Sequence, residues 1–127
     1  MHRWGRVLAA AALVYLATWV VNRSLVEVRG RSMEPALRAG DRLLTVPARR
    51  GTGLRPGQVV VVADPTDADH LVVKRVAAVD HDRLTVLGDH AAASTDSRTW
   101  GPLHRSAVRR VVLRRWPDVR TRLHRHP

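Results

Sequence analysis

Two residues of this chain are able to form a hydrolytic pair: a serine in a bend and a lone lysine in an apolar run. Ser32 lies within residues 28–41, "VRGRSMEPALRAGD", between two arginines and a Met-Glu-Pro turn. Lys74 is the only lysine in a chain with 22 Lys and Arg residues, and it lies in the valine-rich run "HLVVKRV". A serine hydroxyl becomes a nucleophile only when a neighbouring base takes its proton, and a neutral lysine amine is such a base.

The pattern around Lys74 predicts an apolar environment for its amine. Alternate side chains of a strand share a face, so Lys74 is expected beside Val72 and Val76, with its two direct neighbours facing the other way. A lysine that acts as a general base must be neutral near pH 7 to 8, far below its ordinary pKa of about 10.4, and burial lowers the pKa in that direction. Alone, neither residue is specific, because most lysines lie at the surface and serine is common in turns.

The two residues belong to an ordered series of short motifs. An apolar segment comes first, then Ser32-Met33 followed by Pro35, then Gly40-Asp41, then Lys74-Arg75, and finally "GDHAAASTDSR" at residues 88–98. This series resembles the type I signal peptidases, membrane-anchored serine proteases with a Ser/Lys dyad. The resemblance covers essentially the whole chain, and its motifs taken together are highly specific.

The resemblance implies a role for each matching residue. Ser32 is similar to the nucleophile of the family, Lys74 to its general base, and Ser94 to the hydroxyl that orients the lysine amine. The backbone N–H of Ser32 is the natural donor for the oxyanion. The other matches are supporting ones: Asp96 and Arg98 as a structural ion pair beside the site, and Gly88 and Asp89 as the Gly-Asp turn.

Three features depart from the family pattern. His90 stands where the family usually has an Asn after Gly-Asp, which is expected to alter the hydrogen bonds of that turn. Gly30 stands where some members carry a serine hydroxyl that assists the oxyanion. The gap between Ser32 and Lys74 and the stretch after Lys74 are both short, so the large second β-domain of some bacterial members is expected to be missing. These departures indicate a minimal catalytic core, and they keep an inactive scaffold open as an alternative.

The segment before the motifs predicts a membrane anchor within residues 1–24. Residues 7–21, "VLAAAALVYLATWVV", carry no charge, and with residues 4–6 a helix reaches about 27 Å, close to the hydrocarbon thickness of about 30 Å. Arg6 and Arg23 flank the run, and Trp4 and Trp19 lie near its ends, as in membrane spans. A removable signal is disfavoured because no Ala-x-Ala site follows. Charge leaves the orientation open, whereas the resemblance implies a single-pass protein of the cell membrane with an extracytoplasmic catalytic domain.

The rest of the chain predicts a mostly β fold. Short alternating runs separated by Gly and Pro indicate about six strands in residues 25–117, arranged as a small antiparallel β-barrel or sandwich of the signal peptidase type. Residues 48–53 are expected to form a loop between strands. Residues 118–127 are expected to form a basic tail.

The net charge of the chain limits the classes of partner that are expected to bind it. With 22 Lys and Arg against 11 Asp and Glu, the net charge is +11, which favours an anionic neighbour. Residues 105–125 hold an arginine cluster typical of nucleic-acid binding, so a basic module that binds nucleic acid or a membrane surface is the non-enzyme alternative. Sparse aromatic residues and the apolar segment favour anionic membrane lipids, and no nucleic-acid partner is expected.

The expected substrates are precursor proteins that carry leader peptides, with small Ala-like residues beside the cut. Val26, Val28 and the strand that leads to Lys74 are expected to form the pocket walls. A dedicated protease for one precursor, similar to the maturation proteases of nickel-type superoxide dismutase, remains an alternative. No metal or organic cofactor is implied, because the histidines are scattered and cysteine is absent from the chain.

Overall fold

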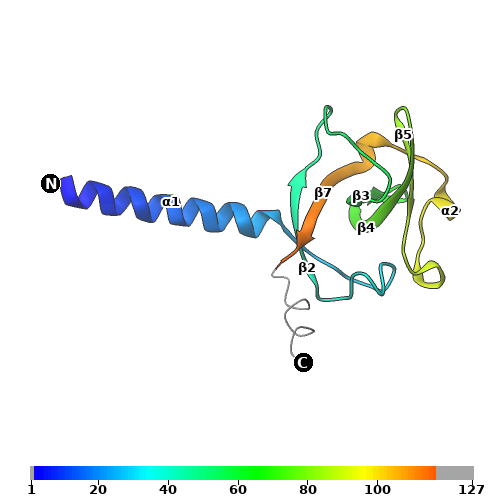
Figure 1. Cartoon of the computed structure of the whole chain (residues 1–127), viewed down its shortest axis with the longest axis horizontal. Helices are drawn as coiled ribbons and strands as arrows, with labels where there is room; N and C mark the ends of the chain where they lie inside the picture. The colour runs from blue at the N-terminus through cyan, green and yellow to red at the C-terminus, as the bar shows by residue number, and fades with distance from the viewer. Residues whose placement is uncertain (1, 117–127) are drawn as a thin grey trace, which may run out of the picture.

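A computed structural model describes residues 2–116 as one long helix followed by a seven-stranded antiparallel sheet (Figure 1). The predicted tail at residues 118–127 lies outside the described residues. The helix is α1 (His2–Ser24), and the strands are β1 (Leu25–Glu27), β2 (Arg42–Pro47), β3 (Val59–Asp64), β4 (Asp67–Asp80), β5 (Arg83–Leu87), β6 (Leu103–His104) and β7 (Val108–Arg115). Three short helices complete the fold: η1 (Ala91–Ala93), α2 (Ser97–Trp100) and η2 (Arg105–Ala107). The predicted mostly β fold is confirmed.

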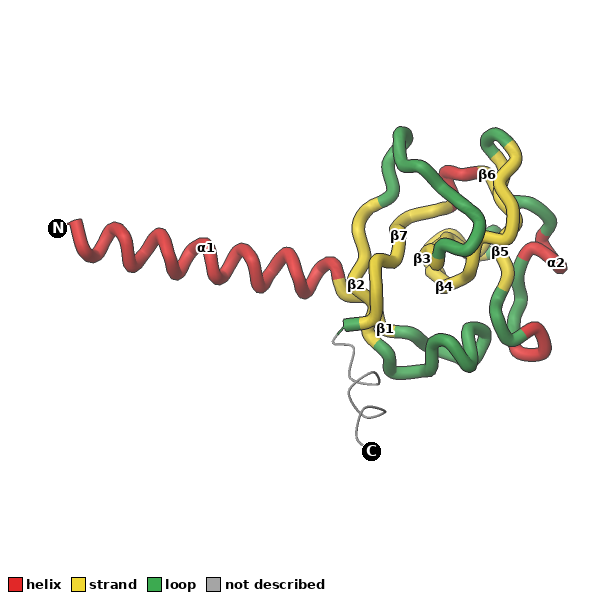
Figure 2. The backbone as a smooth tube through the Cα atoms, viewed as in Figure 1, coloured by secondary structure: helices red, strands yellow, loops and turns green. Residues whose placement is uncertain are grey.

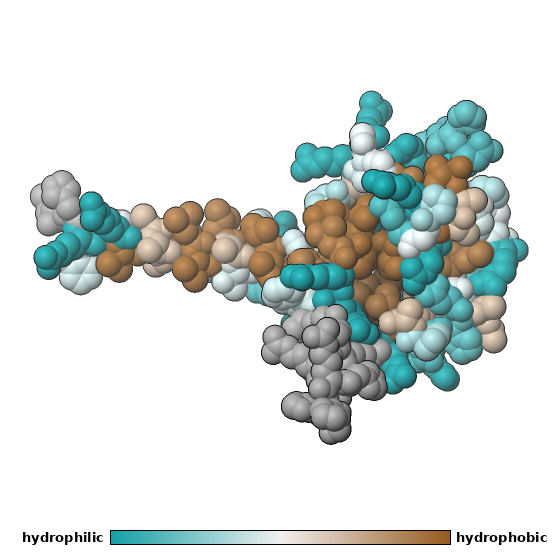
Figure 3. Space-filling view, viewed as in Figure 1, coloured by the Kyte–Doolittle hydropathy of each residue, from teal (hydrophilic) through white to brown (hydrophobic). Residues whose placement is uncertain are grey.

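The helix α1 is exposed and apolar along almost its whole length. Its residues Arg3–Ser24 form a helix long and apolar enough to cross a membrane, and none of its apolar window is buried in the protein. At 1.5 Å per residue, these 22 residues span about 33 Å, which matches a bilayer core. Apolar surface runs along the helix, and hydrophilic groups gather at its free end (Figure 3). A helix that is hydrophobic all round needs an apolar solvent, and lipid supplies one.

The end of the helix joins the sheet without a linker. Helix α1 ends at Ser24 and β1 begins at Leu25. The buried hydroxyl of Thr45 in β2 donates a hydrogen bond to the carbonyl of Ser24 at 2.8 Å, and Arg110 Nε in β7 donates to that hydroxyl in turn. The last turn of the helix is therefore fastened to two strands of the domain.

The sheet has the strand order β1-β2-β7-β3-β4-β5-β6, and each pairing is antiparallel. Strand β4 is 14 residues long and serves two neighbours: its first part pairs with β3 as far as Arg75, and its second part pairs with β5 from Arg75 onward. The sheet curls on itself around the core (Figure 2). Because the pairing with β5 starts at Arg75, the segment of β4 before Arg75 keeps one edge unpaired within the described residues.

The core is made of aliphatic side chains from the inner faces of five strands. Val60 and Val62 of β3 are fully buried, as are Val76 of β4 and Val86 of β5. The rest of this cluster is Leu84, Leu103, Val108 and Val111. Branched valine suits a strand with little rotamer entropy to lose, so the valine-rich runs define both the strands and the core.

Several predicted elements are confirmed and one count is wrong. The strand at residues 42–47, the strand that follows Pro56-Gly57 and the hairpin across His81-Asp82 all form. Residues 48–53 lie in the loop between β2 and β3 and have no regular structure. The structure has seven strands rather than about six. The missed strand is β6, which has two residues and is too short to show an alternating pattern.

Candidate active site

Ser32 and Lys74, which lie far apart in the sequence, line the same open cleft. The cleft has a volume of about 430 Å³, and Ser32 enters it from the loop between β1 and β2, whereas Lys74 enters it from β4. The other lining residues are Gly30, Arg31, Asp64, Thr66, His70, Val72, Ala93, Thr95, Thr99 and Trp100. Neither Val26 nor Val28 is among these described lining residues, and Val28 is buried. Of the expected pocket walls, the strand to Lys74 lines the cleft, through His70 and Val72.

The loop that carries Ser32 is held closed at its base and anchored beside the serine. Val28 donates its amide hydrogen to the carbonyl of Asp41 at 2.7 Å, and Gly40 donates to the carbonyl of Val28 at 2.9 Å. The side chain of Met33, next to Ser32, is 1% exposed and packs inward. Within residues 2–116, neither the amide N–H nor the hydroxyl of Ser32 makes a hydrogen bond, so both are available to a ligand in the cleft.

Lys74 is buried to an unusual degree for a lysine. Its side chain is 3% exposed, and its β4 neighbour Val76 on the same face is 1% exposed. Across the sheet Lys74 pairs with the fully buried Val60 of β3. Burial lowers the pKa of the Lys74 ammonium, and the attraction of Asp96 opposes this shift only in part. The burial predicted for Lys74 is confirmed.

A chain of hydrogen bonds fixes the direction of the Lys74 amine. Lys74 Nζ donates to Ser94 Oγ at 3.1 Å, and Ser94 Oγ donates its own proton to Asp96 Oδ2 at 2.6 Å. A hydroxyl has a single proton, so Ser94 can only accept from Lys74. One N–H of the amine is therefore committed to Ser94, and the nitrogen lone pair of the neutral form points elsewhere.

Asp96 lies at the centre of this arrangement and is fully buried. Arg98 forms a two-point ion pair with it, from Nε to Oδ1 at 3.0 Å and from Nη2 to Oδ2 at 2.6 Å. The amide of Gly88 also donates to Oδ2, at 2.8 Å. Burial alone would raise the pKa of Asp96, but the hydrogen bonds from Arg98, Ser94 and Gly88 hold it well below its usual range. The carboxylate therefore stays charged, and it caps the short helix α2 by accepting from the amide of Arg98.

Gly88 allows the Ser94 and Ser32 segments to approach each other. A Cβ at this position would overlap the Ser94 side chain and would lie 2.7 Å from the carbonyl oxygen of Ser32. Any side chain larger than hydrogen therefore displaces one of these two groups. The sequence identifies Gly88 only through the family motif, and the structure gives a steric reason for it.

Asp89 pairs with Arg75, a contact that the sequence analysis missed. Arg75 donates from Nε and Nη2 to the two carboxylate oxygens of Asp89, each at 2.9 Å, and from Nη1 to the carbonyl of Gly57 at 2.9 Å. The pair links the residue after Lys74 to the turn after β5. Two opposite charges far apart in the sequence carry no local signal, so only a structure reveals this contact.

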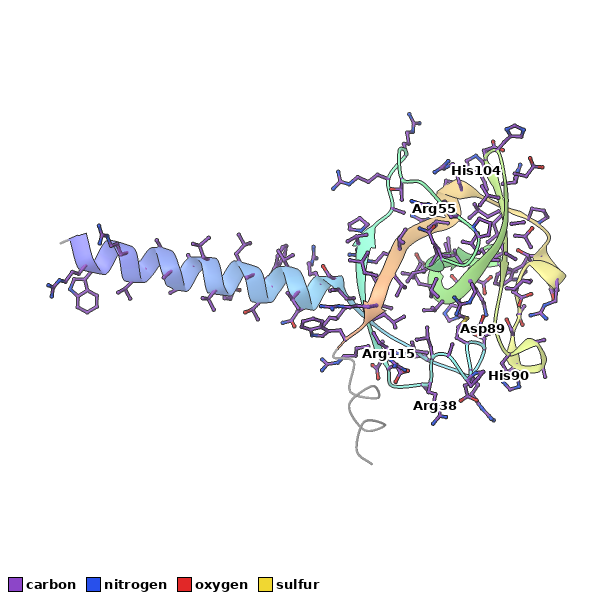
Figure 4. The ribbon with its side chains drawn as sticks, viewed as in Figure 1. Arg38, Arg55, Asp89, His90, His104 and Arg115 are labelled. Carbon is purple, nitrogen blue, oxygen red and sulfur yellow. The ribbon has the colours of Figure 1, made fainter. Side chains whose placement is uncertain are left out.

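His90 keeps the turn through its backbone. Its amide donates to the carbonyl of Ser32 at 2.8 Å, and Asp89 and His90 lie close together near the loop that carries Arg38 (Figure 4). The buried Nδ1 atom of His90 has no hydrogen-bond partner among the described residues. The main-chain contact from His90 to the Ser32 loop is thus present, and the expected change relative to Asn in the hydrogen bonds of the turn stays a prediction.

Comparisons with known proteins bear on the region that holds Ser32 and Lys74. The family model for signal peptidase, peptidase S26, matches residues 1–85. The mitochondrial ATP-independent inner membrane protease subunit 1a of Arabidopsis thaliana is 33% identical, over 74% of this chain and 71% of the relative. The mitochondrial inner membrane protease subunit 1 of Schizosaccharomyces pombe is 29% identical, over 84% of this chain and 85% of the relative. The human subunit 1 is 26% identical, over 73% and 69%.

The match includes the apolar helix, the Ser32 loop and the Lys74 strand, and it ends before Ser94, Asp96 and Arg98. The relatives named above are membrane proteases, and helix α1 is suited to a bilayer, so membrane association follows from both. The chain belongs to the signal peptidase family S26 and is a membrane-associated protease of the signal-peptidase type.

Proposed function

We propose that this protein is a serine endopeptidase that removes N-terminal leader peptides from precursor proteins by a Ser/Lys dyad. In this proposal Ser32 is the nucleophile and Lys74 is the general base. One observation carries the proposal: Lys74 and Ser32 line the same cleft, and the hydroxyl of Ser32 makes no hydrogen bond with the described residues there. The Lys74 amine is buried, its pKa is lowered, and it donates a hydrogen bond to Ser94. No direct hydrogen bond joins Ser32 and Lys74 within the described residues, and catalytic contacts commonly shorten when substrate binds.

The first half of the reaction forms an acyl-enzyme. Ser32 Oγ attacks the scissile carbonyl carbon, and its proton passes to the lone pair of Lys74 Nζ. As the tetrahedral intermediate collapses, the C–N bond breaks and the Lys74 ammonium gives a proton to the leaving amine. The product segment departs with a new N-terminus, and the leader stays bound to Ser32 as an ester.

The second half releases the leader. Water enters the open cleft, Lys74 Nζ takes one of its protons, and the water oxygen attacks the ester carbonyl. The C–O bond to Ser32 then breaks, and the ammonium returns the proton to Ser32 Oγ. Ser94 acts as a positioning residue in both halves, because its bond to Asp96 leaves it only an acceptor for the amine.

The oxyanion of each tetrahedral intermediate needs a donor. The amide N–H of Ser32 is a suitable one, since it makes no other hydrogen bond within residues 2–116. Gly30 lines the cleft two residues earlier and has no side-chain hydroxyl to add. A second donor has to come from elsewhere in the complex with substrate.

The substrate is proposed to bind as an extended strand. The segment of β4 before Arg75 has a free edge, and its residues His70, Val72 and Lys74 line the cleft opposite Ser32. A leader segment that pairs with this edge places its scissile bond between the two reactive groups. Small Ala-like residues beside the cut are proposed from the resemblance to the signal peptidases.

We place the protein in the cell membrane as a single-pass protein with an extracytoplasmic catalytic domain. Anionic lipids are its proposed membrane partners, and nucleic acid is not a proposed partner. The substrate is either secretory precursors in general or one dedicated precursor. A panel of unrelated leader-bearing precursors distinguishes these, since a dedicated enzyme processes one of them.

The test is a processing assay with the full chain in detergent micelles. A leader-bearing precursor is incubated with the native chain, Ser32→Ala and Lys74→Met, with Ser106→Ala and Arg55→Met as matched controls outside the cleft. Processing is expected in the native chain and both controls and is expected to fall by at least about a thousandfold in the two cleft variants. Equal processing by all five proteins contradicts the proposal. Processing by Ser32→Ala at the rate of the native chain contradicts it as well, even if Lys74→Met is inactive.

A further inference from the structure

A second cleft of the β domain is lined by arginines and is separate from the cleft of Ser32 and Lys74. It has a volume of about 520 Å³ and is lined by Ala48, Arg49, Arg50, Thr52, Leu54, His104, Arg105, Ser106, Val108 and Arg109. None of these described residues lines the first cleft. They come from the loop after β2, from the end of β6, from η2 and from the start of β7. The second cleft is therefore a separate feature that the proteolytic reaction does not use.

The lining includes four arginines and no acidic residue among its described residues. Like charges that converge on one concavity repel one another, and low-dielectric walls strengthen the field inside it. Asp82 is the neighbouring acidic residue, and its carboxylate lies 3.4 Å from the ring of His104, one of the lining residues. An anion that enters the cleft removes this repulsion, so the charge pattern indicates an anionic ligand.

The backbone around the arginines is organised in advance. The amide of Arg49 donates to the hydroxyl of Thr52 at 2.8 Å, and the amide of Thr52 donates back to the carbonyl of Arg49 at 3.0 Å. Arg105 Nη2 donates to the carbonyl of Thr52, which ties η2 to the loop. These bonds fix the wall that presents Arg49 and Arg50, so little further ordering of the chain is needed to receive a ligand.

The apolar lining of the cleft and its position on the protein select among anions. The apolar residues of the lining are Ala48, Leu54 and Val108, which belong to the core cluster or pack against it, and such a surface suits an anion attached to a hydrophobic body. The loop with Arg49 and Arg50 directly follows β2, the strand bonded to the end of helix α1, and β2 lies at the helix side of the domain (Figure 1). The cleft is thus held near the layer of head groups that surrounds the helix.

We infer that this arginine cleft binds the phosphate of an anionic phospholipid head group, with the apolar residues of its lining contacting the adjoining glycerol and acyl carbons. Arg49, Arg50, Arg105 and Arg109 supply the charge-assisted hydrogen bonds, for which the planar guanidinium is well suited. The inference rests on the membrane association of the chain and not on the Ser/Lys mechanism.

The test measures binding of a short-chain phosphatidylglycerol, kept below its micelle concentration, to the full chain in zwitterionic detergent. Saturable binding is expected, with no comparable binding of short-chain phosphatidylcholine. The double variant Arg49→Gln/Arg50→Gln is expected to weaken binding by at least about tenfold. The control Arg38→Gln/Arg55→Gln removes the same charge from exposed arginines outside the cleft and is expected to leave the affinity within about twofold.

Several outcomes overturn the inference. Equal weakening in both double variants indicates an effect of net charge alone. Inorganic phosphate that binds as tightly as the lipid indicates a site for free anions, and an oligonucleotide that binds more tightly with the same dependence on Arg49 and Arg50 indicates nucleic acid. The processing assay runs in parallel, and Ser32→Ala is expected to retain lipid binding, so the failure of either proposal is distinguishable from the failure of the other.

Discussion

Ser94 Oγ accepts a hydrogen bond from Lys74 Nζ at 3.1 Å, although the two residues lie 20 positions apart in the chain. The bond joins the middle of β4 to the segment before α2. Its direction is fixed by Asp96, which takes the only proton of the hydroxyl. The contact thus connects a buried amine to a buried carboxylate without a direct ion pair, and this separation keeps the amine from being fully stabilised as an ammonium.

The first prediction concerns Ser94→Ala. Loss of the acceptor frees the Lys74 amine to rotate and to approach the Asp96 charge, which raises the pKa of Lys74. We expect kcat to fall by about a hundredfold, KM to change little, and the acidic limb of the pH–rate profile to move to higher pH. Ser94→Thr keeps the hydroxyl and is expected to recover much of the rate. An unchanged pH profile in Ser94→Ala rules out the positioning role.

The second prediction concerns the cost of burying Lys74. Burial lowers its pKa in the folded state, so the unfolded chain binds more protons at pH values between the folded pKa and the ordinary value of 10.5. The free energy of unfolding is therefore expected to rise with pH across that window. In Lys74→Met this rise disappears, and at neutral pH the variant is expected to be at least as stable as the native chain. Urea unfolding in micelles from pH 6 to pH 10 measures both effects.

A matched control for that experiment is Arg83→Met, an exposed position at the start of β5. This variant removes one positive charge and keeps Lys74, so the rise of stability with pH is expected to persist. If Lys74→Met retains the same rise, the ammonium of Lys74 is not the group responsible.

The third prediction concerns Asp96→Asn. The amide keeps one acceptor oxygen. Its NH₂ group then faces either the Gly88 amide and the Ser94 hydroxyl or, in the other orientation, the amide and Nε of Arg98, so donors lose their partner in both cases. We expect a loss of about 2 kcal/mol in the free energy of unfolding at pH 7. Because the pKa of Asp96 is lowered on folding, the native chain gains this stability above pH 4 and loses it as pH falls toward the folded pKa. The gap between native chain and variant is expected to narrow below pH 4, whereas exposed Asp69→Asn shows no such gap.

The fourth prediction compares two glycines. Gly88→Ala places a methyl group against Ser94 and the carbonyl of Ser32, so we expect a loss of about 1 to 3 kcal/mol in stability together with a large loss of processing. Gly53→Ala meets nothing within 4 Å and is expected to leave processing unchanged and stability within about 1 kcal/mol. Equal behaviour of the two variants in thermal unfolding and processing contradicts the steric account of Gly88.

The sequence predicted those parts of the fold that depend on local pattern. The uncharged run at residues 7–21 predicted the exposed helix, and strict alternation predicted the burial of Lys74 on β4. Strand β6 was not predicted, because two residues are too few to show an alternating pattern. Helix α2 was not predicted either, because a four-residue helix depends on its cap at Asp96 rather than on an apolar face. Short elements of this kind are set by tertiary contacts.

The candidate site was less accessible from the sequence than the fold. Ser94, Asp96 and Arg98 were identified only through the family motif, because nothing in their local sequence indicates a contact with β4. The contact of Arg75 with Asp89 and the polar lining at Asp64 and Thr66 were not identified at all. These contacts form where the curvature of the sheet brings segments together that are distant in the sequence. A single sequence does not show which distant segments this curvature brings into contact. The catalytic roles themselves stay predictions until the variants are assayed.

The direct junction between Ser24 and Leu25 limits how the domain moves. With no linker residue and with Thr45 bonded to the last helical carbonyl, the β domain cannot swing freely about the end of its anchor. The helix then sets the height and tilt of the domain above the lipid surface. The cleft therefore stays at a constant distance from that surface while the protein diffuses in the plane of the membrane. For the proposed leader-peptidase reaction, a cut site has to be presented at that distance, and a precursor that holds it higher or lower is out of reach.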